Sequence, residues 1–371
     1  LSTLGMGDIK EINHHDRVAV VQPGVILEQF HDAVEREGLF YPPDPNSRAS
    51  CGLGGNIAEN AGGPRAVKYG VTRDYVLGVE MAAMTGPLIR MGRRTVKGVV
   101  GYDMTGLFVG SEGTLGVVTE ATLALLHKPD MVLTLLAIFP TPHEAGRAVA
   151  AIFRSRICPR CVELMDAGAL QAVRAQGVGI DPLAGALLLI EVDGEGPACE
   201  RDMERTGEAC VAVGALDVLV AQAGTQSARL WAARRELSPA VRKLAKYKLA
   251  EDVVVPVSQI PALLEKTEAL AERYKVRILT YGHAGDGNMH VNFLWDDPAD
   301  LPRVLGAIEN LFRDVIALRG TISGEHGIGV LKAPYLGLEQ SHELVSLQER
   351  VKKVFDPKGL LNPGKIFPLR V

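Results

Sequence analysis

The sequence predicts a protein of mixed helix and sheet layers that folds as more than one packed unit. Its 371 residues favour two or three domains, because a domain typically contains about 150 residues. Hydrophobic residues make up 47% of the chain and charged residues 23%, which is enough apolar material for a substantial core. Stretches of strand character alternate with stretches of helical spacing along the chain, and this alternation is typical of layered α/β architecture.

The first part of the chain has few regular elements and much glycine. The β-branched run Val18–Val21 predicts a strand, and the apolar spacing of the residues after it predicts a helix up to Gly38. From Tyr41 to Gly70, prolines and glycines are too frequent for any long regular element, so we expect a loop. Two further strands are expected at Val76–Ala83 and Leu115–Leu126.

After Pro129 the alternation becomes regular, so we place a domain boundary there. The strands expected beyond it are Met131–Phe139, Leu187–Val192, Leu216–Ala221, Val253–Val257 and Arg277–Tyr281. The helices expected beyond it are Glu144–Phe153, Cys199–Val213, Ile260–Tyr274, Leu301–Leu318 and Leu344–Val354.

Composition and charge disfavour several classes of protein. Lys plus Arg number 40 against 44 Asp plus Glu, a net charge of −4, so neither nucleic acid nor an anionic membrane is expected as the main partner. The most apolar stretches are far shorter than the roughly 18 residues of a membrane-spanning helix. Five cysteines without a repeating spacing do not form a disulfide framework, and Leu1–Arg17 lacks the pattern of a signal peptide. We therefore expect a cytoplasmic protein without a transmembrane segment.

Two glycine-rich segments, Cys51–Gly63 and Gly110–Gly116, are candidates for binding a flat or phosphorylated ligand. Glycine suits such a site because side chains would obstruct a close approach of the backbone. A pair of tight turns without any ligand explains the composition about as well. Neither segment has the GxGxxG spacing of a Rossmann fold, and no P-loop is present in the sequence, which disfavours a nicotinamide dehydrogenase and a P-loop ATPase.

His283 and His290 flank a Gly-Asp-Gly turn that follows an apolar strand, and a reversal there can bring both imidazoles to one point. A later glycine-flanked loop carries Glu325 and His326. A lone histidine would more often be structural, but two imidazoles and a carboxylate form the ligand set of an open zinc, manganese or iron site. We therefore predict His283, His290 and Glu325 as metal ligands. We predict His326 as a base, because an imidazole with an ordinary pKa of about 6.5 can accept a proton at neutral pH.

Arg234 and Arg235 are expected at the start of a helical stretch. An arginine there can bind a carboxylate through two parallel hydrogen bonds, although solvated arginines paired with Glu236 are the more common outcome. Cys158 and Cys161 form a CxxC pattern without a second pair, so we expect ordinary structural cysteines.

Taken together, these motifs resemble the FAD-linked D-2-hydroxyacid dehydrogenases and oxidases, a family that includes the flavin subunit of bacterial glycolate oxidase and D-lactate dehydrogenases. The resemblance covers nearly the whole chain. The motifs that carry it are Pro43-Asp-Pro45, Gly54-Gly-Asn56, Asn60-Ala-Gly-Gly63, Lys68-Tyr-Gly70, Gly106-Leu-Phe-Val-Gly-Ser-Glu-Gly-Thr-Leu-Gly116, Gly282-His-Ala-Gly-Asp-Gly-Asn-Met-His290, Gly324-Glu-His-Gly-Ile-Gly329 and Leu361-Asn-Pro-Gly-Lys365.

The resemblance implies an α+β fold of the vanillyl-alcohol-oxidase type. We expect residues 1–129 to be the remainder of an FAD-binding domain, residues 130–335 an α/β substrate or cap domain with an antiparallel sheet, and residues 336–371 a tail that returns to the FAD domain. Family members carry a further N-terminal lobe with a glycine-rich loop that binds the FAD pyrophosphate, and this sequence has no counterpart of it. We therefore expect a chain that begins partway through a larger protein.

The resemblance also implies residue roles and a reaction. The residues expected to contact FAD are Gly54, Gly55, Asn56, Gly62, Gly63, Gly70, Gly110, Gly113, Gly116, Val118 and Asn362. His283, His290 and Glu325 match metal ligands, His326 matches the catalytic base, and Arg234 and Asn292 match substrate contacts. The implied reaction oxidises a small D-2-hydroxyacid, glycolate or D-lactate. The hydride passes to FAD, and the electrons pass on to a partner protein or quinone, which can place the protein at the membrane periphery through a partner.

Two other functions stay open. A metal-dependent hydrolase could use the same histidines and Glu325 without flavin, and a fragment unable to hold FAD would be inactive. Visible flavin absorbance would distinguish an oxidase from the hydrolase. Turnover of glycolate or D-lactate would rule out an inactive fragment.

Overall fold

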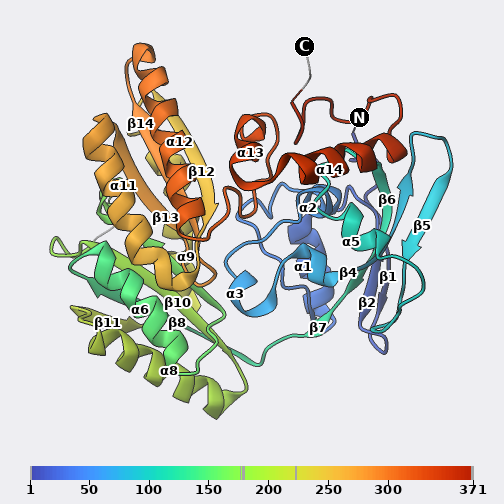
Figure 1. The fold of residues 1–371 in the computed structure, drawn as a ribbon. Coiled ribbons are helices and arrows are strands. Elements are labelled where there is room, and N and C mark those ends of the chain that lie inside the picture. Colours follow the sequence, from blue (N-terminus) through green and yellow to red (C-terminus); the bar gives the residue numbers. More distant parts are fainter. Residues whose placement is uncertain (1, 176, 178–179, 222–223, 369–371) are drawn as a thin grey trace. The chain divides into compact units, whose positions relative to one another are not determined.

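The computed structural model describes residues 2–175, 177, 180–221 and 224–368, and it divides the chain into two compact units (Figure 1). The first unit consists of Leu1–Lys128 and Glu325–Val371, and the second of Pro129–Gly324. The chain therefore leaves the first unit, builds the whole second unit and then returns. The roles expected for residues 1–129, 130–335 and 336–371 stay proposals.

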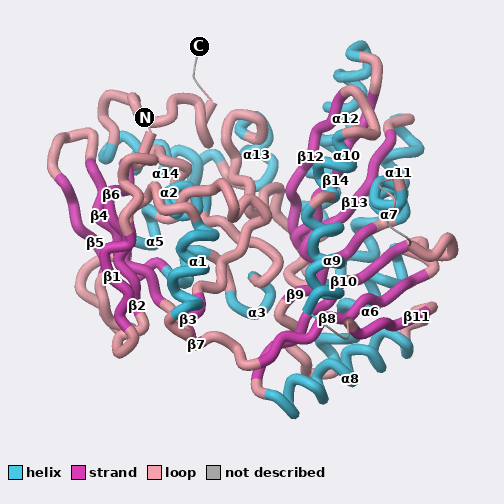
Figure 2. The backbone as a smooth tube through the Cα atoms, turned by 180° about the vertical axis from the view of Figure 1, so that it is seen from behind, coloured by secondary structure: helices cyan, strands magenta, loops and turns pink. Residues whose placement is uncertain are grey.

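The second unit is built on a seven-stranded sheet (Figure 2). Its strand order is β11-β8-β10-β9-β13-β14-β12, and every neighbouring pair is antiparallel. The strands are β8 (Met131–Phe139), β9 (Cys161–Met165), β10 (Ala186–Gly194), β11 (Asp217–Val220), β12 (Tyr247–Val254), β13 (Arg277–His283) and β14 (Asn288–Trp295). Successive side chains of a strand point to opposite faces, so each face of this sheet has its own chemistry.

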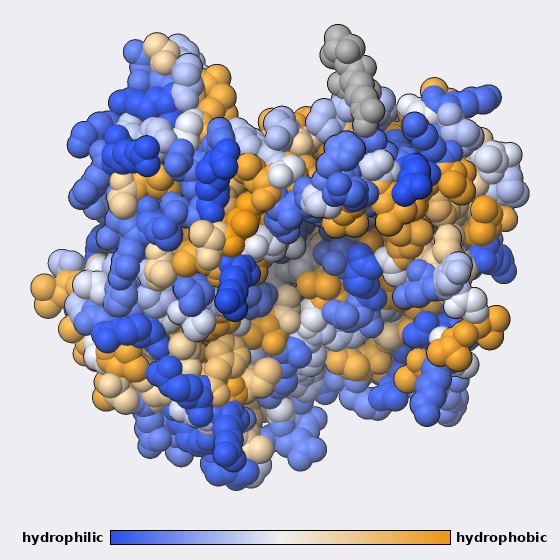
Figure 3. Space-filling model, in the orientation of Figure 1, coloured by the Kyte–Doolittle hydropathy of each residue, from blue (hydrophilic) through white to orange (hydrophobic). Residues whose placement is uncertain are grey.

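One face of the seven-stranded sheet is apolar and is covered by a layer of helices that lie side by side in the order α8, α6, α11, α12. Their bounds are α6 (Pro142–Arg154), α8 (Gly196–Ala212), α11 (Ile260–Tyr274) and α12 (Leu301–Ala317). In α11, Leu263, Leu264 and Leu270 are buried, whereas the outer surface over this helix is mostly hydrophilic (Figure 3). This is the expected pattern of an amphipathic helix on a sheet.

The opposite face carries α7 (Ala167–Arg174), α9 (Gly224–Arg235) and α10 (Leu237–Arg242). Helices α7 and α10 pack in an apolar cluster that includes Leu170, Leu237 and Leu279. Further along the strands the same face becomes polar, and the predicted histidines lie there. Single 3₁₀ turns occur at Val257–Gln259 and Pro298–Asp300.

The first unit contains a five-stranded antiparallel sheet in the order β1-β2-β6-β4-β5. The strands are β1 (Ile9–Asn13), β2 (Val18–Val21), β4 (Val76–Ala82), β5 (Leu88–Gly92) and β6 (Val117–Ala124). Two short strands, β3 (Leu39–Phe40) and β7 (Leu126–His127), pair separately. Strand β6 is central and directly follows the second glycine-rich segment, so the sheet holds one end of that segment in place.

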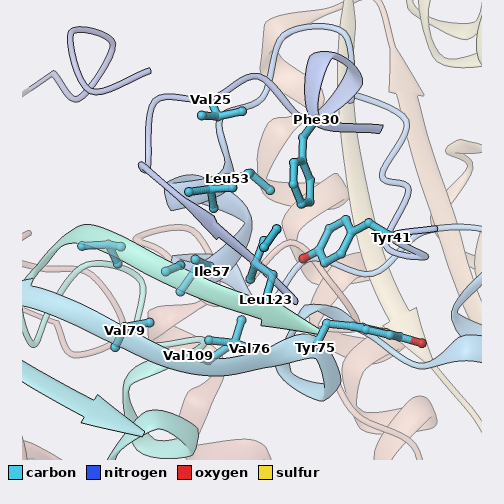
Figure 4. Close-up of a cluster of buried hydrophobic side chains, with 14 of the residues drawn as sticks. Val25, Phe30, Tyr41, Leu53, Ile57, Tyr75, Val76, Val79, Val109 and Leu123 are labelled. Atoms are coloured by element: carbon cyan, nitrogen blue, oxygen red, sulfur yellow. The ribbon is translucent and has the colours of Figure 1, made fainter. Parts of the chain in front are cut away.

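The helices of the first unit are mostly short. They are α1 (Leu27–Arg36), α2 (Leu53–Glu59), α3 (Ala66–Tyr69), α4 (Thr72–Tyr75), α5 (Met104–Phe108), α13 (Leu336–Glu339) and α14 (His342–Phe355), with a 3₁₀ turn at Ala333–Tyr335. Figure 4 shows part of the core, in which Phe30 of α1 and Tyr41 meet edge to face with ring centroids 5.2 Å apart. Leu53 and Ile57 of α2 belong to the same cluster, so the core fixes the helix that carries the first glycine-rich segment.

Most predicted elements are confirmed, and the differences are informative. Strand β8 and helix α11 have the predicted bounds. The strand expected at Val253–Val257 is misplaced, because the ladder with β14 runs through the more polar Tyr247–Val254. The sequence patterns did not predict five of the strands: β1, β3, β5, β9 and β14.

Within the described residues, no helix is both long and apolar enough to cross a membrane.

Candidate functional site

Polar side chains of the second unit gather on one face of its sheet. Residues paired across neighbouring strands share a face, and the register pairs His283 with Glu163, Tyr281 with His290, and Asp252 with His290. Strands β9, β12, β13 and β14 therefore bring acids and imidazoles to one place. All of these strands are internal except β12, so the site lies on a rigid part of the fold.

His283 and His290 lie on the two strands of a hairpin, as their spacing predicts. Their ring centroids are 5.3 Å apart with the planes nearly perpendicular, at 84°. A ring nitrogen of each lies within 4.8 Å of one of the other, and both side chains are buried. Two imidazoles on adjacent strands are a donor set that suits a divalent ion. Their role as metal ligands stays a prediction.

Glu163 is a site residue that the sequence analysis missed, and it lies at the centre of β9 with 0% of its surface exposed. Its Oε1 accepts a hydrogen bond from Nδ1 of His283 at 2.5 Å, and its Oε2 pairs with Nη2 of Arg234 at 2.5 Å. Burial alone would raise the pKa of Glu163, but Arg234 and His283 outweigh burial and hold this pKa at about 2. The carboxylate is therefore ionised at neutral pH.

Asp252 is a second missed acid, and it joins three elements of the second unit. Its Oδ1 accepts from Nδ2 of Asn288 at 2.5 Å and lies 3.8 Å from Nδ1 of His290. Its Oδ2 accepts from the backbone N–H of Gly324 at 2.8 Å. Gly324 is the last residue of the second unit, and Glu325 follows it directly. Asp252 thus binds the backbone directly before the predicted ligand Glu325 and the predicted base His326.

Arg234 lies at the end of α9, which corrects the expectation that a helix starts there. It is not a solvated surface arginine either, because only 6% of it is exposed and its partner is Glu163. Its guanidinium lies over the ring of Tyr281, 5.1 Å from the centroid, and its Nε is buried without a hydrogen-bond partner among the described residues. An unpartnered buried donor costs about 1–3 kcal/mol, so this atom is suited to a bound anion.

Helix α9 is attached to the polar face by side chains at helical spacing. Ser227 and Thr134 share a hydrogen bond of 2.7 Å between their hydroxyls, and Trp231 donates its Nε1–H to Glu191 at 2.5 Å. Arg234 continues this series one turn later. Ser227, Trp231 and Arg234 share one face of the helix. Their spacing is the sequence signal that could have predicted the orientation of Arg234 toward the sheet.

Asn292 lies fully buried on β14. Its Nδ2 donates to the carbonyl oxygen of His290 at 2.9 Å, whereas its Oδ1 is buried and has no hydrogen-bond partner among the described residues. The predicted substrate contacts Arg234 and Asn292 therefore each offer one buried polar atom to a ligand.

Lys248 adds a cation to the same side of β12 as Asp252. Its Nζ donates to Oγ of Ser238 at 3.1 Å. Burial, with a contribution from Arg242, lowers the pKa of Lys248 to about 8.

The residues predicted to bind FAD lie in the first unit, where backbone hydrogen bonds join the two glycine-rich segments. The N–H of Gly110 donates to the carbonyl of Ile57 at 2.9 Å, and that of Glu112 to the carbonyl of Ala58 at 2.8 Å. The C-terminal tail joins them, because Nδ2 of Asn362 donates to the carbonyl of Glu112 at 2.6 Å. Three stretches that are far apart in sequence thus meet.

Several of the predicted glycines are required by the fold itself. Gly63, Gly70, Gly110 and Gly113 adopt positive φ, a conformation that costs little only for glycine. A Cβ on Gly54 would lie 2.6 Å from Cβ of Pro23, and one on Gly116 would lie 2.7 Å from Sδ of Met81. Among the described residues, a Cβ on Gly55 would by contrast meet nothing within 4 Å except its chain neighbours and the backbone of its own helix. Gly55 is therefore the position where open space is left beside the backbone.

Two buried polar atoms in these segments fit a ligand that forms hydrogen bonds. Nδ2 of Asn56 and Oγ of Ser111 have no hydrogen-bond partner among the described residues, although the two side chains are only 4% and 7% exposed. Together with the open space at Gly55, they fit a large polar cofactor such as FAD. Val118 instead packs in the core cluster of this unit.

Glu112, another missed residue, holds the loop that carries Glu325 and His326. Its two carboxylate oxygens accept the backbone N–H groups of Ile328 at 2.6 Å and Gly329 at 2.8 Å. In the same unit, a Cβ on Gly62 would lie 3.1 Å from Oε2 of Glu325. The structure thus brings the predicted ligand Glu325 next to a predicted FAD-binding glycine.

Sequence comparison identifies two families of domain in the chain. The family described as "FAD linked oxidases, C-terminal domain" matches residues 128–366, and "FAD binding domain" matches residues 1–92. The chain is 43% identical to the glycolate oxidase subunit GlcD of Bacillus subtilis (strain 168), over 98% of this chain and 78% of that protein. It is 36% identical to a D-2-hydroxyglutarate dehydrogenase of Stutzerimonas stutzeri (strain A1501), over 98% of this chain and 80% of that protein.

Solved structures resemble the whole fold. The match to p-cresol methylhydroxylase has a TM-score of 0.81 at 15% identity and covers 99% of this chain and 79% of that one. The match to alkyldihydroxyacetonephosphate synthase has a TM-score of 0.72 at 17% identity and covers 96% of this chain and 66% of that one. This likeness confirms the predicted α+β fold of the vanillyl-alcohol-oxidase type.

Proposed function

The chain belongs to the family of FAD-linked oxidases, and on this premise we propose that it oxidises a small D-2-hydroxyacid, glycolate or D-lactate, to the 2-oxoacid with FAD as the oxidant. The observation that carries the proposal is the buried arrangement of Arg234, Glu163 and His283 on the sheet face. An arginine with a free donor beside imidazoles suits a small anion that carries a hydroxyl group.

Substrate binding is assigned to Arg234 and Asn292. The guanidinium of Arg234 would bind the carboxylate, and Oδ1 of Asn292 would accept a hydrogen bond from the substrate. Nε of Arg234 and Oδ1 of Asn292 are buried and have no hydrogen-bond partner among the described residues. Two fixed contacts of this kind orient the hydrogen on Cα, and orientation is a large part of such catalysis.

Proton transfer is assigned to His326. Oxidation of the alcohol removes one proton from the hydroxyl and a hydride from Cα, and a neutral imidazole would take the proton. Glu112 holds the loop of His326 through the backbone N–H groups of Ile328 and Gly329.

FAD binding is assigned to the first unit. The residues that would hold FAD are Gly54, Gly55, Asn56, Gly62, Gly63, Gly70, Gly110, Gly113, Gly116 and Asn362, and bound FAD would supply the two-electron oxidant. His283, His290 and Glu325 would hold a divalent ion of zinc, manganese or iron, which would supply positive charge for the hydroxycarboxylate. We propose the second unit as the substrate domain.

The electrons would leave for a partner subunit or a quinone. The Bacillus relative is named as a subunit of glycolate oxidase, which supports a protein partner. We propose a cytoplasmic protein that reaches the membrane periphery through such a partner.

Anaerobic reduction of the bound flavin tests the proposal. The purified protein is mixed with glycolate, D-lactate, L-lactate and D-2-hydroxyglutarate, and the visible flavin bands are followed. Glycolate or D-lactate should bleach them, and L-lactate should not. A flavin that no hydroxyacid bleaches contradicts the proposal. A protein purified without flavin, but active as a hydrolase with added zinc, favours the hydrolase.

A further inference from the structure

We propose that Glu163 is a positioning residue that orients both the predicted metal ligand His283 and the predicted substrate arginine Arg234. The inference rests on the proposed function, because it concerns the same site. One carboxylate would then link ion binding to substrate binding.

The position of Glu163 supports a fixed role. It lies on β9 between β10 and β13, with no exposed surface. Each of its oxygens has a separate partner at 2.5 Å, Nδ1 of His283 and Nη2 of Arg234. Such contacts leave the carboxylate no alternative orientation that keeps both of them.

The bond to His283 decides which ring nitrogen can bind a metal. Glu163 also pairs with the guanidinium of Arg234, and a carboxylate paired with an arginine only accepts hydrogen bonds, so Nδ1 of His283 is the donor in the contact between these two side chains. The neutral ring then presents the lone pair of Nε2. A carboxylate that fixes a metal-binding histidine in this way typically strengthens metal binding about 10–100-fold.

The ion pair with Arg234 decides which part of the guanidinium faces a ligand. Nη2 is held by Glu163, and the guanidinium lies over the ring of Tyr281 at 5.1 Å. Nε has no partner among the described residues. Because Glu163 holds Nη2, the orientation of the guanidinium and of its unpartnered Nε is fixed.

Stability alone is a weak reason for this arrangement. The desolvation of buried ion pairs costs free energy, and well-packed apolar residues often stabilise a fold equally well. A carboxylate between two groups with predicted chemical roles is better explained by the orientation that it gives them.

The decisive variant is Glu163→Gln, which keeps the shape of the side chain. Its amide oxygen can accept from one partner only, and its NH₂ group must face the other donor. Zn²⁺ affinity is measured by competition with a chromophoric chelator, and KM and kcat for the preferred hydroxyacid are measured by flavin reduction. We expect Zn²⁺ binding to weaken about 10–100-fold and KM to rise several-fold.

Glu191→Gln is the matched control. Glu191 lies on the neighbouring strand β10, is also buried and also pairs with an arginine, Arg160, at 3.3 Å. Its other described contacts are with Thr134, Cys161 and Trp231, none of which is a predicted ligand. Zn²⁺ affinity should therefore stay within about 2-fold of the wild type.

The outcomes separate this inference from the proposed function. A Glu163→Gln protein that folds, binds Zn²⁺ as the wild type does and keeps its KM overturns the inference while the function stands. Weakened Zn²⁺ binding in a protein whose wild type oxidises no hydroxyacid supports the role of Glu163 toward His283 and overturns the function.

A measurement on the wild type covers the case in which the variant does not fold. The ¹⁵N chemical shifts of the imidazoles, with Zn²⁺ absent, report the tautomer of each histidine. Protonation of His283 at Nδ1 supports the inference, and protonation at Nε2 alone overturns it.

Discussion

Two buried glutamates, Glu112 in the first unit and Glu163 in the second, each hold two partners but hold different kinds of group. Glu112 accepts hydrogen bonds from backbone N–H groups of Ile328 and Gly329, so it shapes a loop. Glu163 pairs with the side chains of His283 and Arg234, so it orients groups that can act on a ligand. The first unit thus builds its site from backbone, and the second from charged side chains on strands.

This difference fits the size of the proposed ligands. A large flat cofactor needs backbone that comes close, which glycines and short helices provide. A small anion needs few charges held at fixed positions, which internal strands provide. The predictions below change one kind of group at a time, from the largest expected effect to the smallest.

The largest effect is expected for His326→Ala. Because Glu112 holds this loop through its backbone, loss of the imidazole should leave the loop and the bound FAD in place. Removal of a general base typically costs 10²- to 10⁴-fold in rate, so we expect kcat to fall by roughly that factor. The flavin-to-protein ratio is measured alongside kcat. Flavin lost in proportion to activity would show that His326 supports the structure instead.

A smaller effect is expected for Arg234→Lys. Lysine presents a compact charge in place of a forked donor, so KM should rise about 10-fold or more while the melting temperature changes little. Arg235→Lys, one position along, is the matched control and should leave KM within about 2-fold of the wild type. An unchanged KM with a lowered melting temperature in Arg234→Lys would contradict the assignment.

Two glycines separate the demands of the fold from those of a cofactor. Gly63 has φ +123°, and a Cβ there would lie 2.5 Å from the carbonyl oxygen of Asp44, so Gly63→Ala should destabilise the protein by about 1–3 kcal/mol. Gly55 lies inside α2, where alanine stabilises by about 0.5–1 kcal/mol. Gly55→Ala should therefore keep or raise the melting temperature yet weaken FAD binding. Unchanged FAD affinity in Gly55→Ala would remove this glycine from the proposed cofactor site.

The smallest effect concerns pH and Lys248. Burial lowers its pKa from 10.5 to about 8, so between these values the unfolded chain keeps a proton that the folded chain has lost. Stability should therefore rise with pH over this window. Because the side chain is only half-buried, we expect a gain below about 1 kcal/mol.

The variant Lys248→Met should lose this rise. The free energy of unfolding of the wild type and of the variant is measured with urea at pH 7, 8, 9 and 10. In the difference between the two proteins, titrations common to both cancel. A constant difference across the series would show that Lys248 titrates normally.

The sequence was sufficient where a pattern is local. The apolar spacing of Ile260–Tyr274 predicts α11 with its observed bounds, and the Gly-Asp-Gly turn predicts the meeting of His283 and His290. Strand β14 was missed, although Asn288, His290 and Asn292 alternate with Met289, Val291 and Phe293 as in any strand with two different faces.

The sequence was not sufficient where partners are far apart in the chain. Glu163 breaks the apolar pattern of a five-residue strand, and its burial is explained only by His283 and Arg234. The same holds for Glu112, whose partners follow the entire second unit. Helix α9 was placed on the wrong side of Arg234 because its contacts with the sheet are polar and leave little hydrophobic periodicity.

The first unit is assembled from two stretches of chain, and Glu112 and Asn362 join them. During translation, the earlier stretch therefore emerges from the ribosome and must wait until Pro129–Gly324 and the tail have been made. At roughly 5–20 residues per second, this delay is on the order of tens of seconds. The second unit is continuous and can fold during that interval, so chaperones would have most to protect in the glycine-rich stretch that is synthesised before it.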